Sequence, residues 1–260
     1  MGASDLSRYI WPDADQGRQP QYPVDIDWSN PLSEGLVSAP QFGSLFDPVN
    51  RRYGTESAGV QNVLTPAGIG KYCTAGANLS FLVPPSLGSN PPGVTVIVRF
   101  VAVSNVDYGA IFRKQNDAFT LSLSLSGAGY FNYRGINGNT GGMPGASSRQ
   151  VVPGSVCTLA YSAGGASDAV YIDGIPGTPG SIGIASQSDG VLLFGAGGGG
   201  YNAPNIIYLS AAVFACQLSA EKINELSRNL TQLLRSPLNI GWTVSAAGGG
   251  TLNASASGSS

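Results

Sequence analysis

An Asp-Gly pair, Asp173-Gly174, most constrains the fold of this chain. Asp-Gly next to strand-like residues is a strong signal for a two-residue β-hairpin turn. It directly follows Tyr171-Ile172, and residues 150–161 upstream have a strand pattern. We therefore predict a hairpin at this position, with Asp173 as a turn residue rather than a ligand.

The rest of the chain also favours β-structure. Its 37 glycines and 17 prolines alternate with β-branched runs, which indicates turns between many short strands. A length of 260 residues suits one large all-β domain. Strict alternation in residues 118–125 puts four apolar side chains on one face: Phe119, Leu121, Leu123 and Leu125. The predicted strands are 77–83, 93–102, 109–113, 118–125, 130–133, 150–161, 191–195 and 206–210, and residues 135–148 are predicted to form a long loop.

One helix is predicted, from Ser219 to Leu234. Ser219 is a suitable N-cap, and Glu221 places negative charge in the first turn. Pro237 is expected to end the helix. Apolar residues recur at helical spacing on one face: Ile223, Leu226, Leu230, Leu233 and Leu234.

The order of these features resembles the second half of a laminin-G-like domain. In that family a "YvDG" hairpin precedes a strand ending in Gly (here Gly195), a further strand, and a helix opening like Leu218-Ser-Ala-Glu221. The resemblance covers roughly residues 24–235. It implies an all-β, concanavalin A-like (laminin-G-like) jelly-roll sandwich of two antiparallel sheets, with one C-terminal helix and extended terminal arms. The expected parts are an arm at 1–23, the jelly-roll domain at 24–236 and a Gly/Ala/Ser-rich tail at 237–260.

Residues 24–39, here called the opening segment, resemble the start of laminin-G-like proteins of tailed bacteriophages. The shared residues are Trp28, Pro31-Leu32 and Gly35-Leu36-Val37, while Leu238 stands where that family usually has Trp. This resemblance implies a non-enzymatic structural protein of the virion, either a capsid decoration or a tail or fibre component. Its partners would be other virion proteins and copies of itself. The alternative is a carbohydrate-binding module or lectin outside a virion.

The composition restricts the possible partners. Charged residues make up 11% of the chain, against about 25% in an average soluble protein, so the surface is unusually neutral. With 13 basic and 15 acidic residues there is no basic patch for nucleic acid. No apolar stretch reaches the ~18 residues of a membrane span, and the N-terminus lacks a signal-peptide pattern. Three distant cysteines predict free, buried thiols and synthesis in a reducing cytoplasm.

The residues offer little catalytic chemistry. The chain has no histidine, the commonest general base. Glycoside hydrolysis typically needs two carboxyl groups flanking the bond. The four glutamates are placed in the opening segment (Glu34), a loop (Glu56) and the exposed helix face (Glu221, Glu225), and Asp25 and Asp27 fall at the domain edge. The glycine run 195–200 lacks the Lys and helix of a phosphate loop, so a connection between strands is expected. We therefore predict that the protein is not an enzyme.

Two binding sites are suggested by loop residues. Aromatic and amide side chains in or beside the two glycine-rich loops would suit a host surface glycan, although Asn and Gly are also ordinary turn residues. These residues are Tyr133, Asn137, Asn139, Tyr201, Asn202 and Asn205. The family resemblance allows a calcium ion as the one possible cofactor, held by the loop residues Asp107, Asp117, Asp168 and Asp189.

The N-terminal arm carries aromatic residues, which are unusual in a solvated tail: Tyr9, Trp11 and Tyr22. We expect this arm to dock onto a neighbour or back onto the domain. Edge strands of an open sandwich need covering, so a homo-oligomer or symmetric array is expected.

Overall fold

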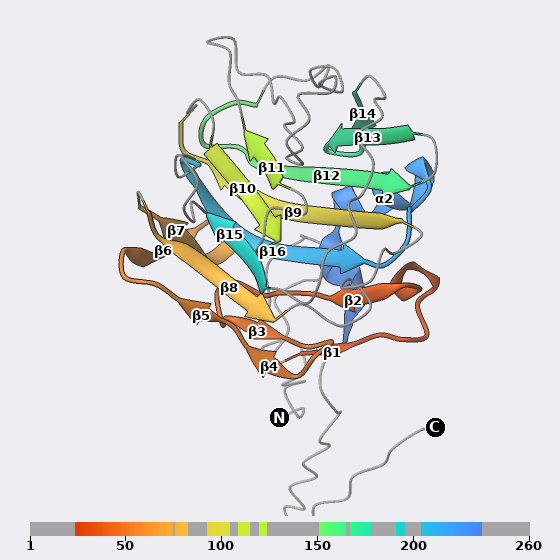
Figure 1. Ribbon diagram of the computed structural model, residues 1–260, viewed down its shortest axis with the longest axis horizontal. Coiled ribbons are helices and arrows are strands. Elements are labelled where there is room, and N and C mark those ends of the chain that lie inside the picture. The colour runs from red at the N-terminus through yellow and green to blue at the C-terminus, as the bar shows by residue number, and fades with distance from the viewer. Residues whose placement is uncertain are drawn as a thin grey trace, which may run out of the picture.

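Two antiparallel β-sheets pack face to face in the computed structural model of the chain (Figure 1). This arrangement confirms the predicted jelly-roll sandwich with one C-terminal helix, α2 (Ala220–Arg228). The structure describes residues 24–74, 76–82, 93–104, 109–114, 120–123, 151–164, 167–177, 191–195 and 204–235. The predicted arms, the strand at 130–133 and the loop at 135–148 lie outside this part of the chain.

Each sheet combines strands from distant parts of the chain. The five-stranded sheet has the order β11 (Thr120–Leu123), β10 (Gly109–Lys114), β15 (Val191–Gly195), β8 (Asn78–Leu82), β5 (Thr55–Glu56). The eight-stranded sheet has the order β14 (Ile175–Pro176), β13 (Ser167–Ile172), β12 (Val156–Gly164), β9 (Val94–Ala102), β16 (Ile206–Phe214), β7 (Gly68–Cys73), β6 (Val60–Thr65), with β2 (Leu36–Ser38) beside β16. Two short pairs complete the strands: β1 (Asp25–Ile26) with β17 (Leu234–Arg235), and β3 (Phe46–Asp47) with β4 (Arg52–Tyr53). Successive strands such as β7 and β8, or β15 and β16, belong to different sheets, so the predicted glycine-run connection crosses between sheets.

An aromatic cluster fills the space between the sheets. The Phe42 ring centroid lies 4.8 Å from that of Phe194 and 5.3 Å from that of Tyr208. Tyr208 of β16 is fully buried, and its hydroxyl donates to the Ile111 carbonyl oxygen of β10 at 2.7 Å. This hydrogen bond connects the sheets across the core. Alternate residues of β9 face the same core: Val94, Val96, Val98, Phe100 and Ala102.

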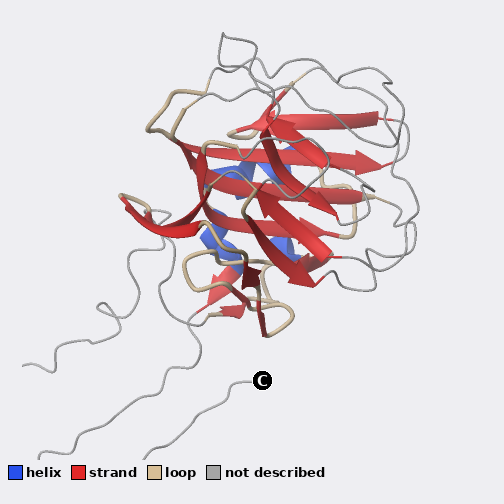
Figure 2. Ribbon diagram, turned by 60° about the vertical axis from the view of Figure 1, so that its left-hand side comes forward, coloured by secondary structure: helices blue, strands red, loops and turns tan. Residues whose placement is uncertain are grey.

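The outer face of the eight-stranded sheet is covered by α2 and the 3-10 helix η4 (Leu230–Leu233) (Figure 2). Ile97 of β9 and Phe214 of β16 belong to the same buried cluster as Ile223 and Leu226 of α2. The central strands β9 and β16 are therefore buried on both faces. This explains why both are almost continuously apolar rather than alternating.

The predicted hairpin turn is confirmed. Asp173 and Gly174 alone join β13 to β14, and their φ angles are both positive, at 49° and 79°. Positive φ at both central residues is the geometry of a type I′ turn, which Asp-Gly favours. The Asp173 carboxylate also accepts a hydrogen bond from the Thr158 backbone N at 2.7 Å. Asp173 thus has the structural role that the sequence predicts.

The C-terminal helix begins where predicted but ends earlier. The Ser219 hydroxyl caps it by accepting from the Lys222 N at 3.3 Å. At Asn229 the backbone leaves the helical conformation, with φ at −151°, and the side chain accepts from the Thr231 N at 3.0 Å. Asn229 therefore caps η4 instead of continuing α2, because its short amide competes for backbone donors. The predicted start of the helix is confirmed, while its predicted end, at Leu234 before Pro237, is wrong.

The strands between residues 36 and 73 are not among those predicted. In β6, Val60 and Leu64 lie on one face and Val63 on the other, so the period-two signal is weak. This region forms the hairpin β6–β7 and the short strands β2 to β5. Its structure depends on pairing with β16 and β8 rather than on local pattern.

Candidate functional site

One end of the sandwich brings together strand ends from both sheets. There β9 ends at Ala102 opposite Ile206, the first residue of β16, and β12 begins at Val156. The larger sheet's β7 also ends here, and the chain then enters β8 of the smaller sheet. The start of β8 pairs with the end of β15, and the start of β10 lies beside that end of β15. We call this end the Asn205 rim and define it by Tyr72, Val103, Ser104, Val152, Val156 and Asn205.

Both glycine-rich segments of the sequence connect strands at the Asn205 rim. Residues 124–155 run from the end of β11 to the start of β12, and residues 196–205 run from β15 to β16. Strand register therefore brings the anchor points of the two segments to one end of the molecule. Of the six predicted glycan-binding residues, Asn205 is described, and the others lie outside the described residues: Tyr133, Asn137, Asn139, Tyr201 and Asn202.

Asn205 is half-buried immediately before β16 and joins three strands. Its side-chain oxygen accepts from the Tyr72 hydroxyl of β7 at 2.7 Å, and its amide nitrogen donates to the Ser104 hydroxyl beyond β9. Its backbone oxygen accepts from the Val103 N at 2.9 Å. An amide carries two donors and two lone pairs, so among the described contacts one of each is left for a ligand. Asn205 can thus hold the rim together and still bind a hydroxyl group.

Three valines expose apolar surface beside Asn205. Val103, Val152 and Val156 are 41%, 59% and 38% exposed. They lie together because the Gly154 N donates to the Ala102 oxygen at 2.7 Å, folding residues 152–155 against the end of β9. The rim therefore offers apolar surface and amide groups side by side. Tyr72 and these valines were not predicted as site residues, because only strand pairing brings them to Asn205.

The predicted calcium site stays a prediction, because the side chains of its four aspartates lie outside the described residues. Asp107 lies between β9 and β10, whose adjoining ends belong to the Asn205 rim. Asp117 lies between β10 and β11, Asp168 at the β12–β13 turn and Asp189 before β15, and these strand ends lie at the opposite rim. Asp107, Asp117 and Asp189 are outside the described residues, and Asp168 is placed on β13 by its backbone. Among described residues, no three His, Cys, Asp or Glu side chains gather as metal ligands.

The described carboxylates mostly have structural partners. Glu56, expected in a loop, lies on β5 and pairs with the buried Lys71 at 2.7 Å. Asp47 is buried and accepts from the Ser38 hydroxyl at 2.6 Å and the Ala39 N at 3.0 Å. Glu34 pairs with Lys222 at 3.1 Å. Each of these three carboxylates thus has a partner within the fold.

An open groove of about 570 Å³ lies between the β13–β14 hairpin and α2. Its lining is polar and of mixed charge: Gly174, Pro176, Ala220, Glu221, Asn224, Glu225 and Arg228. It contains the two helix glutamates that the sequence places on the exposed face. The lining has no aromatic side chain on which a sugar ring could stack. The Asn205 rim is therefore the better candidate for a glycan.

The cysteines are free, as predicted, and two of them are buried. Burial raises the pKa of the Cys73 thiol to about 12, so this thiol stays protonated at neutral pH. Burial also raises the pKa of Cys216, which is half-buried. Neither group has the depressed pKa of a nucleophilic thiol.

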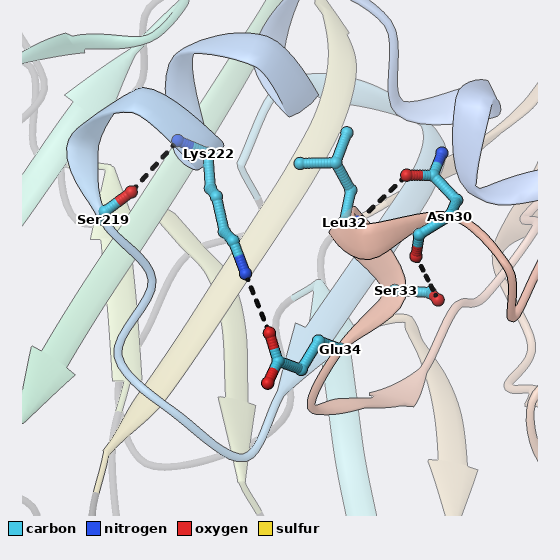
Figure 3. Close-up of polar contacts among 6 residues, drawn as sticks. All are labelled: Asn30, Leu32, Ser33, Glu34, Ser219 and Lys222. Carbon is cyan, nitrogen blue, oxygen red and sulfur yellow. Dashed lines mark hydrogen bonds and ion pairs between the residues drawn. The ribbon is translucent and has the colours of Figure 1, made fainter.

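The opening segment connects the helix layer to the sandwich (Figure 3). The Asn30 side chain accepts from the Leu32 N at 2.9 Å and caps the 3-10 helix η2 (Pro31–Ser33). Leu32 and Leu36 belong to the same buried cluster as the apolar side chains of α2. The Lys222–Glu34 ion pair joins the segment to that helix. Gly35 has a φ of 77°, which favours glycine. Most residues that carry the family resemblance thus have structural roles, while Trp28 is exposed.

No family model and no curated protein matches the chain. Solved structures share its fold. Domain 4 of a GH43 extracellular arabinanase from Geobacillus stearothermophilus, in complex with arabinotriose, has a TM-score of 0.53 at 14% identity, covering 74% of this chain and 98% of that domain. Trypanosoma rangeli sialidase in complex with sialic acid has a TM-score of 0.54 at 14% identity, covering 76% and 33%. A structure of botulinum neurotoxin type C, whose cell entry depends on two ganglioside molecules, has a TM-score of 0.54 at 10% identity, covering 75% and 51%.

The chain spans nearly all of the arabinanase domain but only about a third of the sialidase and half of the neurotoxin structure. At these identities the likeness shows the fold alone, a β-sandwich. Within the described part of the chain, no helix has the length and apolar character of a membrane span.

Proposed function

We propose that this chain is a non-catalytic glycan-binding domain whose site is the Asn205 rim. The observation that carries the proposal is the strand register, which anchors both Gly/Asn-rich segments at the rim that holds Asn205. Amide groups suit sugar hydroxyls, and the exposed valine side chains suit the apolar faces of sugar rings. The arabinanase domain, solved with arabinotriose, supports this choice because the chain covers nearly all of it.

Glycan binding is tested with the full chain on a glycan array, followed by titration of the best ligand. We expect Tyr133→Ala and Tyr201→Ala each to weaken binding at least about five-fold, since a lost stacking contact costs ~1 kcal/mol or more. Tyr53→Ala is the matched control, because Tyr53 is an exposed aromatic on β4 away from the rim. The proposal would be contradicted if the chain bound no glycan, or if Tyr53→Ala weakened glycan binding as much as the two rim variants do.

A second candidate is a structural protein of a tailed-bacteriophage virion, either a capsid decoration or a tail or fibre component. The opening segment supports it, because most residues that carry the phage resemblance, Trp28 excepted, form a specific, well-packed structure. The neutral composition also suits a protein packed against other virion proteins and copies of itself. The two functions are compatible, since a virion protein can bind a host surface glycan.

The virion location is tested by mass spectrometry of purified virus particles from the source, with the copy number measured against the major capsid protein. Hundreds of copies would indicate decoration, and a few to a few tens would indicate a tail or fibre component. Absence from particles would leave the lectin function alone.

A further inference from the structure

Among the described residues, strand β6 forms an edge of the eight-stranded sheet with no strand paired to its outer side, on the left-hand side of Figure 1. Proteins blunt sheet edges with short strands, proline, charge or bulges. The opposite edge, β14, has two residues and ends in Pro176, and the edge strand β5 has two residues and includes Glu56. By contrast, β6 has six residues, no charge, no proline and an unbroken register with β7. Strand β6 therefore lacks the short length, the proline and the charge that protect those other edges.

The register shows which backbone groups of β6 face outward. The Thr74 N donates to the Gly59 oxygen at 3.2 Å, so this pair is hydrogen-bonded. Because bonded and non-bonded pairs alternate along an antiparallel ladder, Gln61 and Val63 also bond to β7. The N–H and C=O groups of Asn62 and Leu64 therefore point away from the sheet. Among the described residues, no hydrogen bond engages these groups.

The side chains at these positions are also available. Asn62 is exposed, and Leu64 is 80% exposed, more than any other large hydrophobic side chain described. Both are uncharged, so two such edges meeting each other bring no like charges together. A net charge of −2 on the whole chain adds little repulsion. The edge is thus complementary to itself, as a two-fold interface requires.

We propose that two copies of this chain associate by antiparallel pairing of β6 with β6. In the register that uses both outward-facing residues, Asn62 lies opposite Leu64 of the second copy and Val63 lies at the two-fold axis. Four backbone hydrogen bonds then join the copies, and the eight-stranded sheets form one continuous sheet. This association is independent of glycan binding at the Asn205 rim.

The test measures mass and backbone protection together. Sedimentation of the full chain between about 1 and 100 µM should show a monomer–dimer equilibrium. Hydrogen exchange at the Asn62 and Leu64 amides should slow as the dimer forms. A chain that stays monomeric with rapid exchange at both amides overturns the proposal. Protection of both amides in a monomer also overturns it, because another segment of the same chain would then cover the edge.

A second experiment introduces positive charge on the β6 edge. The double variant Asn62→Lys with Leu64→Lys should weaken dimerisation at least about ten-fold, because the introduced ammonium groups of the two copies then face each other across the interface. Both positions are exposed, so urea unfolding of the monomer should change little. Leu82→Lys is the matched control: Leu82 is 58% exposed at the end of β8, a strand paired on both sides. Unchanged dimerisation in the double variant would show that another surface joins the copies.

Discussion

At the scale of residues, the ion pair of Lys71 with Glu56 links the two sheets at their shared side. Lys71 lies on β7 of the larger sheet with 7% of its side chain exposed, while Glu56 lies on β5 of the smaller sheet with 42% exposed. An ammonium group so far from water needs a counter-charge, and its removal leaves an uncompensated charge. The pair therefore stabilises the packing of one sheet against the other.

The variant Glu56→Gln should destabilise the protein by about 2 kcal/mol, below the ~3–5 kcal/mol of a fully buried pair because Glu56 is partly exposed. Glu34→Gln is the control, since Glu34 is 80% exposed and its partner Lys222 is half-buried, and it should cost less than about 1 kcal/mol. Urea unfolding measures both free energies. Equal losses in the two variants would show that the burial of Lys71 is unimportant.

At the scale of elements, the β13–β14 hairpin packs closely against α2 at Gly174. Gly174 has a φ of 79°, and a Cβ there would lie 2.7 Å from the Cα of Asn224 on the helix. The Asn224 side chain also donates to the Gly174 oxygen at 3.4 Å. Glycine is thus required at this position both by the turn and by the close approach of the helix.

Gly174→Ala should therefore cost more than strain in the turn alone. Gly154→Ala is the matched control, because Gly154 has a φ of 84° but no neighbouring atom within 4 Å of the position that an added methyl group would take. We expect about 1 kcal/mol for the control and about 1–3 kcal/mol more for Gly174→Ala, from overpacking against the helix. Thermal or urea unfolding measures the difference. Similar losses would mean that the helix moves away without cost.

At the scale of the whole molecule, the core between the sheets holds two groups that ionise only at high pH. Burial raises the pKa of Cys73 to about 12 from an ordinary value of 9.0, and it raises the pKa of Tyr208 well above its ordinary value of 10.0. In both cases the folded state binds the proton more tightly than the unfolded state does. Their contribution to stability is therefore complete below about pH 9 and is lost as the pH rises from there toward 12.

The free energy of unfolding should consequently fall between about pH 9 and pH 12, by at most about 1.4 kcal/mol per pH unit for each group. Urea unfolding at a series of pH values measures the slope. In Cys73→Ala the decline that begins near pH 9 should be shallower, because the thiol no longer titrates. An unchanged slope in that variant would show that Cys73 does not contribute.

Much of the fold was predictable because its signals are local. Asp173-Gly174 specifies a turn through the φ angles that these residues tolerate, and Ser219 specifies a helix start through a bond three residues away. The helix end was not predicted, because the apolar spacing continues through η4 while Asn229 breaks the backbone. Glu56 was assigned to a loop because its strand is two residues long and forms only by pairing with β8.

By itself, the sequence determined the hairpin turn, the central strands and the start of the helix, since each depends on residues adjacent in the chain. Its resemblance to a known family indicated the sandwich. The tertiary structure alone decided which strand ends share a rim and which described strand forms the edge of the larger sheet. The hydrogen bond from Tyr72 to Asn205 joins residues 133 positions apart, and the one from Tyr208 to Ile111 joins residues 97 apart. Such contacts depend on strand register, which arises from the pairing of whole strands and leaves no local pattern in the sequence.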